Sequence, residues 1–141
     1  MKKAIICRGE AEKQLELFKD ACGYEDPKEI ATGGKQTTFP VEVMERVIAS
    51  IMLGRSEVTP DGKNLAYTLK VPVKDLTVVT IAPRMIKQHE RRQVMEGVFE
   101  EYEMGVKMLS LCSTLTAFEI SEMVNADADT LMSIAGLTSF M

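Results

Sequence analysis

The sequence predicts a single α+β domain of 141 residues, with a small antiparallel sheet and a mainly helical C-terminal half. Apolar residues alternate with other residues from Leu65 to Val73, and a second β-branched run follows at 76–81. Together these runs are typical of a hairpin over residues 65–81. After Pro83 the apolar residues recur at helical spacing to the end of the chain. A short apolar run at residues 3–7 predicts a strand that joins the hairpin, because three strands are more stable than two.

Two helices are predicted before the hairpin. Apolar residues at helical spacing lead up to Gly23, which is a common type of residue at a helix end. Residues 23–39 are predicted to form a loop with one helical turn after Pro27, and an apolar stripe after Pro40 predicts the second helix, up to Gly54. A polar connection over 55–64 follows. The alternative to one unit is a division into an N-terminal extension, 1–54, and the part 65–141.

Residues 84–112 are predicted to form one long helix with two apolar faces. The broad face is a core stripe, and Met104, Met108 and Leu111 lie roughly opposite it. A helix with two apolar faces is usually buried on both sides. The second face is covered by the C-terminal helices, by another subunit or by a bound partner, and the sequence leaves these alternatives open. Two shorter helices are expected to follow, the first after a capping box at 116–119 and the second capped by Asp127 or Asp129.

The charges on the predicted long helix are segregated. Its first third is basic, and acidic residues follow at positions 96, 100, 101 and 103. The basic residues are Arg84, Lys87, Arg91 and Arg92. Two such helices packed antiparallel would match basic end to acidic end, which predicts a homo-oligomer contact through residues 84–112. The alternative is a solvated, charge-striped surface.

Composition narrows the class of protein. The chain has 45% hydrophobic and 27% charged residues, as expected for a globular protein. A net charge of −4 argues against a general nucleic-acid binder, which needs a basic face. The longest apolar stretches are far too short to span a membrane. Three cysteines without a close pair fit a reducing compartment, and we read no export signal, so a cytoplasmic location is expected.

No catalytic site, metal site or cofactor site is predicted. The single histidine, His89, lies among basic residues and lacks a cysteine or carboxylate at metal or nucleophile spacing. The segment 33–38 resembles a phosphate loop but lacks the required glycine and the hydroxyl residue after its lysine. The alternating polar residues at 125, 127 and 129 lack the glycine and glutamate of a calcium loop. The sequence therefore predicts a protein that is not an enzyme.

The order of elements over residues 65–141 matches a pattern seen elsewhere. A strand that ends near Pro72 leads to a second strand and then to a helix that starts at Pro83-Arg84. The segment 115–127 (Leu-Thr-Ala-Phe-Glu-Ile-Ser-Glu-Met-Val-Asn-Ala-Asp) follows, and then an apolar helix with Phe140 near its end. This part of the chain resembles the small tail assembly chaperones of contractile and Mu-like phages. The resemblance implies a non-catalytic protein that binds the helical tape measure protein and recruits tail subunits in the host cytoplasm.

A methionine-rich surface suits that task, because methionine side chains adapt to variable apolar partners. The candidate partner-binding residues are Met104, Met108, Leu111, Met123 and Met132. The basic cluster Arg84, Lys87, Arg91 and Arg92 is suited to acidic segments of the partner. The first alternative function is a structural subunit of a phage virion or tail-like particle, and the second is a small regulatory or nucleic-acid-associated module.

Overall fold

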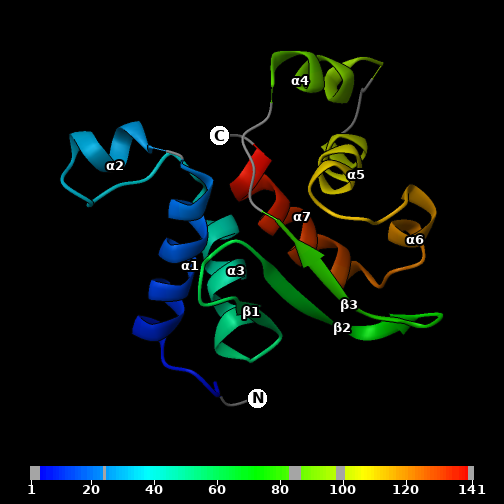
Figure 1. Cartoon of the computed structure of the whole chain (residues 1–141), viewed down its shortest axis with the longest axis horizontal. Coiled ribbons are helices and arrows are strands. Elements are labelled where there is room, and N and C mark those ends of the chain that lie inside the picture. The colour runs from blue at the N-terminus through cyan, green and yellow to red at the C-terminus, as the bar shows by residue number, and fades with distance from the viewer. Residues whose placement is uncertain (1–3, 24, 83–86, 98–100, 140–141) are drawn as a thin grey trace.

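The computed structural model describes residues 4–23, 25–82, 87–97 and 101–139 and confirms the α+β class (Figure 1). A three-stranded antiparallel sheet occupies the middle of the chain, and the part after it is helical. The elements are α1 (Arg8–Cys22), α2 (Pro27–Ala31), α3 (Val41–Met52), β1 (Ser56–Val58), β2 (Leu65–Val73), β3 (Leu76–Ile81), α4 (Gln88–Met95), α5 (Glu101–Cys112), α6 (Ala117–Ser121) and α7 (Asn125–Ser139).

The predicted hairpin over 65–81 is present. β2 and β3 pair antiparallel, with Leu65 opposite Ile81 and Tyr67 opposite Val79. Lys74 takes a positive φ of 54° in the tight turn between the strands. The register shifts between Thr68 and Val73, so the middle of β2 bulges out of regular pairing.

The third strand is not the predicted one. Residues 4–7 do not form a strand, and the backbone N–H groups of Ile5 and Ile6 instead donate to the carbonyl of Met52, at 2.8 and 3.1 Å. β1 pairs with β2 in their place and lies in the segment predicted as a polar connection. Its side chains alternate buried, exposed, buried, but three residues are too few for that period to be recognised in a sequence.

The predicted long helix is interrupted. α4 ends at Met95, and Gly97 has a φ of +68°, in the left-handed region that favours glycine. α5 then begins at Glu101 as a separate helix that packs against α4. The prediction of one continuous helix over 84–112 is therefore wrong, because a left-handed residue ends a helix.

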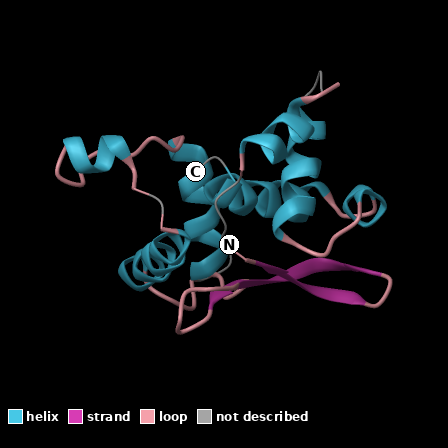
Figure 2. Ribbon diagram, turned by 45° about the horizontal axis from the view of Figure 1, so that its top comes forward, coloured by secondary structure: helices cyan, strands magenta, loops and turns pink. Residues whose placement is uncertain are grey.

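The hydrophobic core lies between the helices and one face of the sheet (Figure 2). β2 contributes Leu65, Tyr67 and Leu69, which alternate with more exposed residues. The last helix, α7, packs against β2, α3 and α5, and it buries Leu131, Ile134, Ala135 and Leu137. This central position makes α7 the element on which the other layers are assembled.

A buried carboxylate fastens α7 to the bulge of β2. Asp127 is 0% exposed and lies in the first turn of α7. Its Oδ1 accepts hydrogen bonds from the Tyr67 hydroxyl at 2.7 Å and from the Lys70 N–H at 3.0 Å, and its Oδ2 accepts from the Val71 N–H at 3.2 Å. Both backbone donors lie within the irregular part of β2, so the carboxylate substitutes for regular strand pairing there. We call this arrangement the Asp127 clamp.

A second carboxylate fixes the segment between α2 and α3. Asp26 caps α2 by accepting from the N–H groups of Lys28 and Glu29, at 3.1 and 3.2 Å. It also accepts from the Thr37 hydroxyl at 2.5 Å and from the Thr38 N–H at 3.0 Å. One side chain therefore holds both ends of the loop that leads into α3.

Replacing Asp127 with asparagine tests the clamp. The amide has only one acceptor oxygen and turns an N–H₂ group toward a donor, so at least one buried donor loses its partner. We expect the free energy of unfolding to fall by about 1–3 kcal/mol. The control is Asp129→Asn on the exposed side of the same helix, which should change it by less than about 0.5 kcal/mol. Urea denaturation followed by circular dichroism measures both, and equal effects would contradict the clamp.

Asp26 makes the stability depend on pH. Burial alone raises the pKa of this carboxyl, but the hydrogen bonds from Thr37, Thr38 and Glu29 outweigh burial and lower the pKa from 3.8 to about 2. The folded state favours the ionised form of Asp26. The contribution of this carboxylate to the free energy of unfolding is therefore complete above the pKa of the unfolded chain, and it is lost as the pH falls toward about 2. The difference in stability between the native chain and Asp26→Asn should therefore shrink as the pH falls. Urea midpoints between about pH 5 and about pH 2.5 measure it, and a constant difference would refute this role.

Candidate functional site

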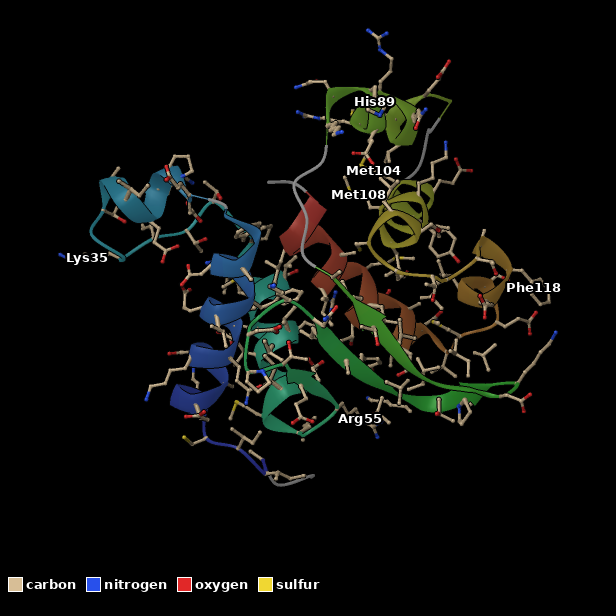
Figure 3. All side chains as sticks on the ribbon, in the orientation of Figure 1. Lys35, Arg55, His89, Met104, Met108 and Phe118 are labelled. Carbon is tan, nitrogen blue, oxygen red and sulfur yellow. The ribbon has the colours of Figure 1, made fainter. Side chains whose placement is uncertain are left out.

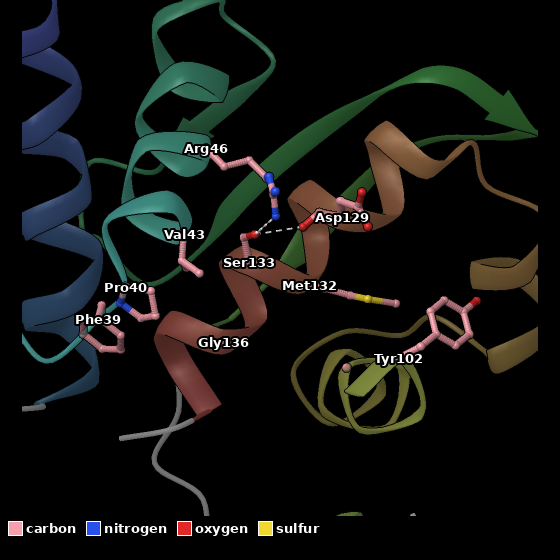
Figure 4. Close-up of a pocket in the computed structure, with 10 residues that line it drawn as sticks. Phe39, Pro40, Val43, Arg46, Tyr102, Asp129, Met132, Ser133 and Gly136 are labelled. Carbon is pink, nitrogen blue, oxygen red and sulfur yellow. Dashed lines mark hydrogen bonds between the residues drawn. The ribbon is translucent and has the colours of Figure 1, made fainter. Parts of the chain in front are cut away.

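α3 and α5 both pack against α7, and a groove of about 430 Å³ lies between them with α7 as its floor (Figure 4). The lining residues come from these three helices and from the residues just before α3. They are Phe39, Pro40, Val43, Arg46, Tyr102, Gly105, Asp129, Met132, Ser133 and Gly136.

The floor of the groove is one face of α7. Asp129, Met132, Ser133 and Gly136 follow one another at intervals of three, one and three residues, which places them on the same side of a helix. The core residues of α7 interleave with them and form the other face. α7 therefore supports the core with one side and forms the floor of the groove with the other.

The walls are mostly apolar. Val43 of α3 and Phe39 before it form one wall, and Tyr102 of α5 stands at the opposite rim with 52% of its surface exposed (Figure 4). α5 lies close to the floor because residue 105 is glycine. A Cβ atom there would be 2.9 Å from the sulfur of Met132, too close for a larger residue without movement.

Two charged side chains lie together on one side of the groove. The Arg46 guanidinium donates to the Ser133 hydroxyl at 3.0 Å, and that hydroxyl donates to the backbone carbonyl of Asp129 at 2.9 Å (Figure 4). The Asp129 side chain is exposed beside them. The groove therefore offers a cation and an anion beside a mainly apolar surface, an arrangement that can orient a bound segment.

Phe39 is held in place by a buried cation. The Lys19 ammonium lies 5.6 Å from the centre of the Phe39 ring, and it forms ion pairs with Glu16 at 3.3 Å and Glu29 at 3.4 Å. Burial alone lowers the pKa of Lys19, but the two carboxylates raise it above its ordinary value. The lysine is therefore charged at neutral pH, and its ammonium makes a cation–π contact with the ring of Phe39.

The structure brings only one of the predicted apolar site residues, Met132, into this groove. Met104 and Met108 lie on the side of α5 that faces α4 (Figure 3). Met108 is 4% exposed, and Met104 and Leu111 are partly buried. Much of the second apolar face of the predicted helix is thus buried within the chain, on the side of α5 that packs against α4. Met123 is likewise part of the core.

The predicted basic residues lie apart from the groove lining. Lys87 directly precedes α4, Arg91 and Arg92 belong to it, and all three are exposed. Arg84 lies outside the described residues. The homo-oligomer contact was predicted for one straight helix, and the separation of α4 from α5 removes that geometry. A contact between copies stays a prediction without this support.

Sequence reasoning missed most of the groove. The spacing from Asp129 to Gly136 was a usable signal, but a face with an aspartate, a serine and a glycine is typical of a solvated surface. Nothing local shows that α3 and Tyr102 of α5 stand on either side of it. The missing information was the packing of three helices that are far apart in the sequence.

The described residues hold little recognisable reaction chemistry. They contain no group of three His, Cys, Asp or Glu side chains that could hold a metal ion. His89 is exposed on α4, and Cys112 is buried with its thiol directed to backbone carbonyls of its own helix. No helix among these residues is long and apolar enough to cross a membrane.

No known protein family, curated protein or solved structure matches the chain.

Proposed function

We propose that the protein is a non-catalytic assembly chaperone that binds a helical segment of a partner protein in the groove between α3, α5 and α7. The observation that carries this proposal is the groove itself, in which faces of three helices converge without filling the space between them. An amphipathic helix is the common occupant of such a groove, since it lays its apolar face on the walls.

The lining is suited to a helix whose side chains vary along its length. Met132 is flexible and adapts to different apolar shapes. Gly136 on the floor presents no side chain, so a backbone can approach closely there. The rings of Phe39 and Tyr102 supply large apolar contacts, as aromatic residues commonly do in binding sites.

The partner class comes from the resemblance of residues 65–141 to phage tail assembly chaperones. In that family the client is the long, helical tape measure protein, whose exposed apolar stripes favour aggregation before the tail is built. A client of this kind needs a site that accepts many similar turns of helix, which fits a shallow and adaptable groove. A structural subunit would use the same groove permanently and would be present in the finished particle, whereas a chaperone would be absent from it.

Tyr102→Ala tests the groove. Removing an exposed aromatic side chain at its rim should weaken binding of a synthetic amphipathic helical peptide about tenfold, by analogy with aromatic residues that dominate interfaces. The matched control is Phe118→Ala, because Phe118 is also aromatic, is 58% exposed and lies on α6 outside the groove. Fluorescence anisotropy with a labelled peptide gives the dissociation constants. Equal losses in both variants, or none in either, would refute binding in the groove.

A further inference from the structure

We infer that α4 is a second docking element, which binds acidic side chains that flank the apolar stripe of the partner helix. This inference rests on the proposed function, because it assigns a charge to the helix that occupies the groove. The partner is therefore specified as an acidic amphipathic helix of a protein, and the recognition chemistry is the pairing of carboxylates with guanidinium and ammonium groups.

The first observation is that three cations at α4 lack an ion-pair partner among the described residues. Lys87, Arg91 and Arg92 are exposed, and none of them has an ion-pair partner in the part of the chain that the structure describes. Two basic residues of the N-terminal half are paired, by contrast: Arg8 bridges Glu12 and Glu45, and Lys19 bridges two further carboxylates. Other exposed cations, such as Lys13 and Lys63, have no ion-pair partner among the described residues either, so the distinguishing feature of α4 is that its cations lie close together in the sequence. The basic side chains of α4 are thus available to an external anion.

The second observation is the two-sided character of α4. Its inner side buries Val94 against the rest of the molecule. Gln88, Arg91 and Met95 recur at intervals of three and four residues, so they share a face of the helix, and that face is exposed. Met95 is 49% exposed and adds an apolar contact beside the arginines. A mixed basic and apolar face is better suited to an acidic amphipathic helix than to an anion alone.

The third observation is the position of α4. It lies at the same end of the molecule as the C-terminal end of α7, whose outer face is the floor of the groove (Figure 1). α4 also packs on α5, the helix that carries the rim residue Tyr102. A helix longer than the groove can therefore continue toward α4, and one partner can contact both elements.

The charge of the molecule favours a protein partner over nucleic acid. The chain has a net charge of −4, and α4 itself is flanked by Glu96, so an extended phosphate backbone would meet repulsion around a small basic patch. A helix presents its acidic residues on a short stretch and turns its apolar face to the groove. The cations at α4, together with the mainly apolar groove, are complementary to a helix with this distribution of acidic and apolar residues.

The test uses the full chain and two synthetic helical peptides of about 20 residues, long enough to form a stable amphipathic helix. Both carry the same leucine stripe, but the flanking positions are glutamate in one peptide and lysine in the other. Isothermal titration calorimetry at low salt should show the glutamate peptide binding at least about fivefold tighter, and the preference should shrink as salt is added. The variant Arg91→Ala/Arg92→Ala should lose this preference.

The control variant Lys13→Ala/Lys63→Ala removes two exposed cations elsewhere and should keep the preference. Equal binding of both peptides, combined with a loss of binding in Tyr102→Ala, would overturn the role of α4 and leave the groove intact. Failure of both peptides to bind would overturn the proposed function as well. A preference retained without the two arginines would also refute the inference, as would tighter binding of a DNA duplex through them.

Discussion

The Asp127 clamp is the interaction on which the arrangement of this molecule depends. A buried carboxylate is costly unless it is hydrogen-bonded, and here three donors satisfy it, one from a tyrosine side chain and two from the bulge of β2. Its place in the first turn of α7 adds the favourable field of the helix N-terminus. Burial, the hydrogen bond and the carboxylate charge together raise the pKa of Tyr67, so its hydroxyl stays a donor. The clamp thereby fixes the start of α7 against the sheet.

Because one end of α7 is fixed against the sheet, one face of this helix is directed to the core and the other to the groove. The face with Leu131, Ile134 and Leu137 is committed to the core, so the face from Asp129 to Gly136 is turned away from it. α5 comes close at Gly105, and α3 is linked to α7 through Arg46 and Ser133. The groove is thus a consequence of how three helices are attached to one another. Its apolar walls, with Arg46 and Asp129 beside them, support the proposed role of holding a helical partner. The cations at α4, which have no ion-pair partner among the described residues, support the further inference that this partner is acidic.

The sequence predicts those parts of the fold that are determined by residues close together in the chain. The hairpin over 65–81, the end of α1 at Gly23, and the capping box of Thr116 and Glu119 are all present. The sequence predicts Asp127 or Asp129 as a helix cap, and it does not reveal the partners of Asp127, because these lie 56 to 60 residues away in the sequence. The predicted helix over 84–112 includes Gly97, because one glycine inside a helix costs only about 1 kcal/mol. Tertiary packing therefore decides whether the helix continues at such a residue. Once that break is known, the burial of Met108 beneath α4 follows. The groove could not be predicted, because it depends on where α3, α5 and α7 lie relative to one another.

The central claim, that α7 presents a partner-binding face opposite its core face, can be tested through the ten methionines of the chain. Methyl spectra of the protein labelled at methionine would be recorded while an amphipathic helical peptide is added. The signal of Met132 should shift and saturate, whereas the signals of the buried Met108 and Met123 should stay in place. Shifts at Met104 and Met108 with an unchanged Met132 would place the partner on α5 beneath α4 and contradict this account.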